Sequence, residues 1–124
     1  VLLAFGGSQG ARALNEAIAA WVRAGLPDGL AVIWGTGRGQ FEPYAPLDGA
    51  SHGRVRVLPY LAPIADAYAA ADVALTRAGA MSIAELCAWG LPSVLVPLPT
   101  AAQDHQAHNA RALATAGAAI HLPQ

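Results

Sequence analysis

Three segments of the sequence carry residue types that ligand-binding chemistry requires. Residues 6–11 (GGSQGA) follow an apolar run and precede a stretch with helical spacing. Glycines let a backbone approach a ligand closely, and the start of a helix offers free N–H groups to a phosphate or sugar oxygen. The glycine spacing differs from the GxGxxG dinucleotide fingerprint, and the lysine of the GxxxxGK[ST] loop is missing. A ligand-binding loop and a plain tight turn therefore both explain this segment.

The second segment, residues 77–85 (RAGAMSIAE), also leads from an apolar run into a predicted helix. The small residues Gly79 and Ala80 would leave the amides of the helix N-terminus open to a diphosphate. Glu85 could then accept hydrogen bonds from both hydroxyls of a ribose. The alternative is structural, with Glu85 in the first helical turn complementing the helix dipole and Ser82 acting as the N-cap.

The third segment, residues 99–109 (PTAAQDHQAHN), is dense in amide and imidazole groups. Such groups both donate to and accept from sugar hydroxyls, as carbohydrate binding requires. A metal site built from Asp104, His105 and His108 is a second interpretation, although no HExxH pattern accompanies it. A solvated polar helix end capped by Asp104 is the third.

The remaining candidates do not assemble a nucleophilic site. Ser8 and Ser82 lack an evident partner base, and Cys87 falls within a predicted helix, where we expect a small buried apolar side chain. Arg77 is expected to pair with a neighbouring carboxylate and orient its loop. Core or domain-contact positions are expected for Trp21, Trp34 and Trp89.

The composition predicts one globular domain and excludes several classes of function. Of the 124 residues, 55% are hydrophobic and 12% charged, which excludes a disordered chain. The net charge is −1 and the basic residues are dispersed, which argues against nucleic-acid binding. No run approaches the roughly 20 apolar residues of a membrane span, and no signal peptide is visible. The chain begins at Val1 within an apolar run, so we expect it to be part of a longer protein.

Predicted strands and helices, which could position these segments, alternate along the chain. This alternation predicts a parallel sheet with helices on both faces, in which ligands bind beyond the carboxyl ends of the strands. Residues 35–53 lack a sustained period and are predicted to be loop, with a short helix near Gln40. We expect strands at residues 1–5, 31–34, 54–58, 72–76, 93–96 and 118–122, and helices at residues 11–24, 64–71, 82–89 and 104–116.

The order of four motifs gives the chain a resemblance to one family. GGSQGA, RAGAMSIAE, GLPSVLVP, and DHQAHNA before AGAA resemble the C-terminal domain of the MurG family of N-acetylglucosaminyltransferases, nearly end to end. The resemblance implies a GT-B fold, in which two Rossmann-like domains face each other across a cleft. Residues 1–124 would be the C-terminal, UDP-GlcNAc-binding domain, and the N-terminal acceptor domain is expected outside this chain.

The resemblance also assigns roles to individual residues. Ser8 would contact the donor, Leu61 would meet the uracil through its backbone, and Glu85 would bind the ribose hydroxyls. Gln106, with His105 beside it, would contact the GlcNAc hydroxyls. The helix start that would hold the diphosphate and ribose comprises Gly79, Ala80, Met81, Ser82, Ile83, Ala84 and Glu85. The chain departs from the family after Trp34, where it has Gly35-Thr36-Gly37 in place of a His-Gln pair and a glycine, one residue shorter.

The implied reaction transfers GlcNAc from UDP-GlcNAc to undecaprenyl-pyrophosphoryl-MurNAc-pentapeptide (lipid I), giving lipid II with inversion. It needs no metal or other cofactor, and its catalytic base is expected in the N-terminal domain, so this chain alone is expected to be inactive. The full enzyme would lie peripherally on the cytoplasmic face of the bacterial inner membrane. Two alternatives stay open: a GT-B glycosyltransferase with a different acceptor, and a non-catalytic nucleotide-binding module. A dinucleotide-dependent oxidoreductase is disfavoured by the glycine spacing.

Overall fold

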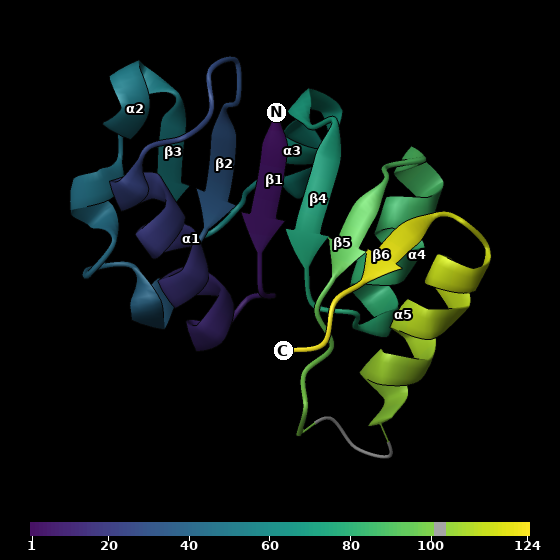
Figure 1. Cartoon of the computed structure of the whole chain (residues 1–124). Helices are drawn as coiled ribbons and strands as arrows, with labels where there is room; N and C mark the ends of the chain where they lie inside the picture. The colour runs from purple at the N-terminus through teal and green to yellow at the C-terminus, as the bar shows by residue number, and fades with distance from the viewer. Residues whose placement is uncertain (101–103) are drawn as a thin grey trace.

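The computed structural model describes residues 1–100 and 104–124, which form a parallel sheet flanked by helices (Figure 1). The strands are β1 (Leu2–Phe5), β2 (Val32–Gly35), β3 (Val55–Leu58), β4 (Val73–Thr76), β5 (Ser93–Leu95) and β6 (Ala119–His121). The helices are α1 (Arg12–Ala24), α2 (Ala50–Gly53), α3 (Ile64–Ala70), α4 (Ala80–Trp89) and α5 (His105–Thr115), with short 3-10 helices η1 (Arg38–Gln40) and η2 (Ala45–Leu47).

The strands lie in the order β3-β2-β1-β4-β5-β6, and every pair is parallel. The chain first builds outward from β1 to β3, then crosses back and builds outward from β4 to β6. The order therefore reverses between β1 and β4, which pair from Leu2 with Val73 to Phe5 with Thr76. In sheets of this kind the loops beyond such a switch point form the ligand crevice. The predicted Rossmann-like fold is confirmed.

Each face of the sheet carries its own apolar core. Successive residues of a strand point to opposite faces, so β1 sends Leu2 and Ala4 to one core and Leu3 and Phe5 to the other. The first core packs against α1, whose buried residues Leu14, Ile18 and Val22 recur every four positions. The second core packs against α3, α4 and α5, through residues that include Tyr68, Leu86 and Ala110. Because β1 contributes to both cores, its end is held firmly from two sides.

The main elements agree with the sequence-based prediction, with two differences in detail. Helix α4 begins at Ala80, two residues before the predicted start, because Gly79 is extended and occupies the N-cap. The stretch from 35 to 53 contains η1, η2 and α2 rather than one short helix. These turns are too short to show the periodicity on which sequence analysis depends.

Candidate functional site

Two adjoining pockets open at the switch point between β1 and β4. The first pocket has a volume of about 530 Å³ and is lined by residues that include Gly6, Arg77 and Gln106. The second has a volume of about 370 Å³, and its lining includes Leu61 and Glu85. Gly7 and Ser82 line both pockets. All three segments singled out in the sequence thus contribute to one connected site.

The glycine loop between β1 and α1 is shaped mainly by close packing. A Cβ on Gly6 would lie 2.3 Å from the Cβ of Ala11, and one on Gly10 would lie 2.1 Å from the carbonyl oxygen of Thr36. A Cβ on Gly7 would meet nothing within 4 Å, but the φ of +91° at this position favours glycine. The tight-turn explanation therefore accounts for Gly6 and Gly10, while Gly7 gives both pockets a bare backbone wall.

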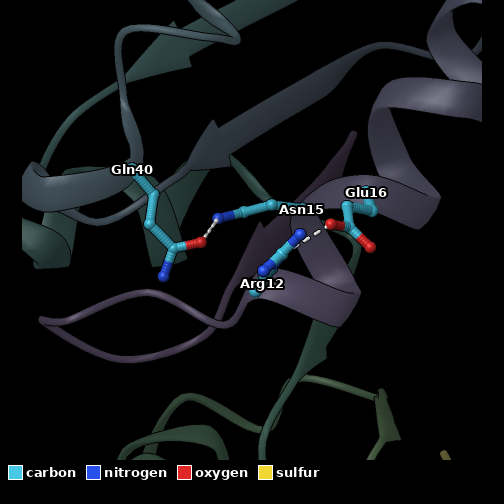
Figure 2. A network of polar contacts seen from close by, with 4 residues as sticks. All are labelled: Arg12, Asn15, Glu16 and Gln40. Atoms are coloured by element: carbon cyan, nitrogen blue, oxygen red, sulfur yellow. Dashed lines mark hydrogen bonds and ion pairs between the residues drawn. The ribbon is translucent and has the colours of Figure 1, made fainter.

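A polar network around Asn15 holds this loop against the end of β2, and Figure 2 shows its hydrogen bond between Asn15 and Gln40. The Nδ2 group of Asn15 donates to the carbonyl oxygen of Thr36 at 2.8 Å and to Oε1 of Gln40 at 2.9 Å. Its Oδ1 accepts from Nε1 of Trp34 at 2.9 Å, and Nε2 of Gln40 donates to the carbonyl oxygen of Gln9 at 3.2 Å. The Gly35-Thr36-Gly37 segment is thereby fastened to the loop that carries Ser8.

Sequence analysis did not identify Asn15 as part of the site. Asn15 lies next to Leu14 and three residues before Ile18, which places it on the buried side of α1. Asn15 is 1% exposed. A polar residue on an apolar helix face must find partners, because an unpaired buried amide is costly. The position of Asn15 among the apolar residues of this helix face was therefore the signal from which the sequence could have identified it.

The start of α4 corrects two structural expectations. Ser82 lies inside the helix and is not its N-cap, since Gly79 takes that position without a side-chain hydrogen bond. Glu85 is not in the first turn, so it does not complement the helix dipole there. Because the N-cap is a glycine, no N-cap side chain covers the first amides of α4, which lie beside the first pocket that Gly79 and Ser82 line.

Arg77 is buried beside the first pocket without the carboxylate partner that we expected. It is 8% exposed, and its Nη1 donates to the carbonyl oxygens of Val96 and Pro97, both at 3.2 Å. Within the described part of the chain its Nε has no hydrogen-bond partner. Burial lowers the pKa of Arg77. The lining of the first pocket therefore includes a guanidinium cation. Among the described residues, no acidic side chain contacts this cation to neutralise its charge.

Glu85 lies at the second pocket in a defined orientation. Its Oε2 accepts a hydrogen bond of 2.6 Å from the hydroxyl of Tyr68, on α3. Ser8, Leu61 and Met81 line the same pocket. At the pocket's edge the guanidinium of Arg38 stacks over the ring of Tyr60, 4.3 Å from its centroid.

Three residues of the predicted helix segment line neither pocket: Ala80, Ile83 and Ala84. Ala80 and Ala84 are exposed, and Ile83 packs on the second core. Helical geometry explains this, because only one side of α4 can face the ligand crevice. Ala80 could therefore contact a ligand only through its backbone amide.

Gln106 and Asn109 join α5 to the loops after β4 and β5. Oε1 of Gln106 accepts from the backbone N–H of Leu98 at 2.9 Å and of Ala78 at 3.3 Å. Nδ2 of Asn109 donates to the carbonyl oxygen of Ala78 at 3.0 Å. The N–H and the carbonyl group of Ala78 are thus both hydrogen-bonded to side chains of α5. Because Ala78 immediately precedes Gly79, these bonds fix the backbone at the point where α4 begins.

The described residues of the third segment do not form a metal site. Among residues 1–100 and 104–124 no group of three or more His, Cys, Asp or Glu side chains could hold a metal ion, so Asp104, His105 and His108 do not converge. Asp104 occupies the N-cap of α5 with φ of +55°, but its side chain makes no capping bond. His105 is exposed and lines neither pocket. Ala101, Ala102 and Gln103 of this segment lie outside the described residues.

Other single-residue expectations have mixed outcomes. Cys87 is exposed on α4, so the expected burial is wrong. Trp34 is fully buried, as predicted for a core residue. Trp21 is 38% and Trp89 48% exposed, so these two are not core residues, and their role in a domain contact stays a prediction. None of the described helices has the length and apolar character needed to cross a bilayer.

Comparison with known proteins shows one family. The family model described as the glycosyltransferase family 28 C-terminal domain matches residues 1–124. A UDP-N-acetylglucosamine–N-acetylmuramyl-(pentapeptide) pyrophosphoryl-undecaprenol N-acetylglucosamine transferase of Sorangium cellulosum is 46% identical over 129 residues, covering 99% of this chain and 31% of that protein. The transferase of the same name from Chlorobaculum parvum is 50% identical over 119 residues, covering 96% and 32%.

Solved structures are similar over the same length. The crystal structure of MurG from Acinetobacter baumannii superposes with a TM-score of 0.87 at 38% identity, covering 98% of this chain and 35% of that one. A glycosyltransferase of kitacinnamycin has a TM-score of 0.74 at 24% identity, a likeness of fold alone. The chain spans about a third of the length of the curated relatives that it matches.

Proposed function

Because this chain belongs to the family of glycosyltransferase family 28 C-terminal domains, we propose that it binds UDP-GlcNAc as the donor half of an inverting N-acetylglucosaminyltransferase. The relatives' names state the donor and the acceptor of the proposed reaction, which forms lipid II from lipid I in peptidoglycan synthesis. One observation carries the proposal for this chain. The two pockets meet at Gly7 and Ser82, with Glu85 in the lining of the second pocket and Gly79, at the start of α4, in the lining of the first.

The second pocket would take the uridine. Leu61 and Gly35 form part of its wall, and the pocket also contains the carboxylate of Glu85. An apolar wall suits the flat face of a uracil ring, and backbone groups near Leu61 could pair with its edge. The carboxylate of Glu85 has the acceptor capacity to receive both ribose hydroxyls.

The first pocket would take the diphosphate and the sugar. The uncapped amides at the start of α4 and the positive end of its dipole favour an anion there. Arg77 adds a buried positive charge to the same pocket. Since Oε1 of Gln106 is occupied by two backbone N–H groups, its Nε2 is the group that could donate to a GlcNAc hydroxyl.

This arrangement would stabilise the leaving group during transfer. The acceptor hydroxyl attacks the anomeric carbon, the bond from that carbon to the β-phosphate oxygen breaks, and UDP leaves with the bonding electrons. Amides and a cation that are already in place stabilise the negative charge that develops on UDP. The proton of the acceptor passes to a general base, which we place in an N-terminal acceptor domain outside this chain. No metal or other cofactor enters the proposal.

The lipid I acceptor would be bound by that same N-terminal domain, across the cleft from the two pockets. We place the complete enzyme peripherally on the cytoplasmic face of the bacterial inner membrane, because its acceptor is carried on an undecaprenyl lipid.

Calorimetric titration of the chain with UDP, UDP-GlcNAc and NADH tests the donor site. We expect saturable binding of UDP and UDP-GlcNAc and none of NADH. Glu85→Ala should weaken UDP binding by about tenfold or more, because hydrogen bonds to a charged group contribute roughly 1.5–3 kcal/mol. The matched control is Glu42→Ala, which changes an exposed glutamate outside both pockets and should leave the affinity unchanged. Equal binding by the Glu85→Ala variant and the wild-type chain would contradict the ribose assignment.

A further inference from the structure

The hydroxyl of Tyr68 makes a short hydrogen bond to a residue of the proposed donor site. It lies 2.6 Å from Oε2 of Glu85, although the two residues belong to different helices, α3 and α4. Tyr68 is 3% exposed and lines neither pocket. It therefore acts on a ligand only through Glu85.

The ring of Tyr68 is fixed by aromatic neighbours on two sides. Phe5, at the end of β1, meets it edge-on with ring centroids 6.1 Å apart. Trp89 stacks on it with centroids 6.0 Å apart and an interplanar angle of 29°. Because Phe5 and Tyr68 are 6% and 3% exposed, the ring of Tyr68 is packed in the core, and this packing sets the direction in which its hydroxyl points.

We propose that Tyr68 is a positioning residue, which holds the carboxylate of Glu85 in the orientation that receives the ribose hydroxyls and so makes the site prefer ribonucleotides to 2′-deoxyribonucleotides. The inference rests on the proposed function, in which Glu85 binds the ribose. Through Tyr68, the core of the domain would contribute to the specificity of the site for its nucleotide.

The chemistry of the pair supports this role. Burial, together with the hydrogen bond to Glu85, raises the pKa of Tyr68, so the phenol keeps its proton and always donates. A carboxylate has about four acceptor positions, so one bond from Tyr68 leaves capacity for two ribose hydroxyls. A free glutamate side chain rotates among several conformers, and fixing it beforehand removes that entropy loss from the binding step.

The test compares UDP with 2′-deoxy-UDP as calorimetric probes of the chain and of its Tyr68→Phe variant. The phenylalanine keeps the ring and its packing but removes the donor. We expect UDP to bind about three- to tenfold more weakly to the variant, and 2′-deoxy-UDP to change by less than about twofold, as for the loss of one hydrogen bond. Tyr44→Phe is the matched control, since Tyr44 packs on Trp34 in the other core and lines neither pocket.

A purely structural role would weaken both probes equally, and that result would overturn the inference. So would a Tyr68→Phe variant that binds UDP like the Tyr44→Phe control, while Glu85→Gln still loses UDP affinity; in that case the proposed donor site would stand. Absence of UDP binding by the folded wild-type chain would overturn the donor site and this inference together.

A second measurement covers the case in which Tyr68→Phe does not fold. The chain has three tyrosines, so fluorine NMR of 3-fluorotyrosine-labelled protein gives resolvable signals, assigned with Tyr44→Phe and Tyr60→Phe. Titration with UDP should shift the Tyr68 signal more than titration with 2′-deoxy-UDP at saturation. Equal shifts from the two nucleotides would count against the inference.

Discussion

At the scale of single residues, polar side chains in the interior of this domain hold the site together. Asn15 uses both its amide hydrogens and its oxygen within the protein, and Gln40 extends the same network to the backbone of Gln9. Gln106 and Asn109 do the same for Ala78 on the other side of the crevice. Side chains that belong to the helices thus help to hold the loops of the site in place.

We predict that Asn15→Ala lowers the free energy of unfolding by about 2–4 kcal/mol, because it leaves the buried N–H of Trp34 and the carbonyl of Thr36 without partners. Urea denaturation followed by circular dichroism measures this change. The same helix provides a control in Arg12→Ala, which removes the exposed Arg12–Glu16 ion pair of Figure 2. That variant should unfold at the wild-type urea concentration, since solvent screens such a pair. Equal midpoints for all three proteins would show that the network does not stabilise the fold.

At the scale of elements, two strand ends and two helix starts meet at one edge of the sheet. The loop after β1 packs on the end of β2, and the loop after β4 is fixed by α5. Each loop is therefore supported by a neighbouring element from its own half of the sheet. This arrangement lets short loops present backbone groups to a ligand without moving when it binds.

Gly10 and Gly29 form a matched pair for testing the packing of the first loop. Both have φ of +80°, but a Cβ on Gly10 would meet the carbonyl oxygen of Thr36 at 2.1 Å, whereas one on Gly29 would meet nothing within 4 Å. Gly29→Ala should cost about 1 kcal/mol of stability through backbone conformation alone. Gly10→Ala should cost at least about 3 kcal/mol, because the clash with backbone adds to the same strain. Similar losses of stability for the two variants in chemical denaturation would mean that the loop carrying Gly10 separates easily from the loop carrying Thr36.

At the scale of the whole molecule, the domain presents the proposed donor site with one open side. The two pockets lie at the carboxyl edge of the sheet, and the relatives that match this chain are about three times as long. In the proposed enzyme a second domain brings the acceptor and the base to that open side. Donor binding and transfer are then separable properties.

We predict that the 124-residue chain binds UDP-GlcNAc but does not transfer GlcNAc. Binding should raise the unfolding temperature with ligand concentration, adding about 2.7 kcal/mol of stability when the ligand is at 100 times its Kd. Transfer is measured with radiolabelled UDP-GlcNAc and a soluble lipid I analogue. Turnover by the purified chain would show that the base lies within these residues, and Glu16, which lines the first pocket, would be the first residue to substitute.

Local pattern was enough to predict the architecture of this protein. Apolar runs alternating with helical spacing predicted the strands and main helices, because burial of one helix face or of a whole strand imposes a period that can be read along the chain. The glycine loop and the polar segments after successive strands were placed at one edge by the rule that parallel strands end on the same side. The family followed from the order of those motifs.

Tertiary structure alone decided which residues touch. Tyr68 reaches Glu85 across 17 positions, and Asn15 reaches Gln40 across 25. No local period encodes such contacts, because they depend on how two helices pack on a sheet. For the same reason Arg77 binds carbonyl oxygens rather than the expected carboxylate, and Cys87 faces outward. The sequence therefore determined where the site lies, and packing across the sheet determined how its side chains are held.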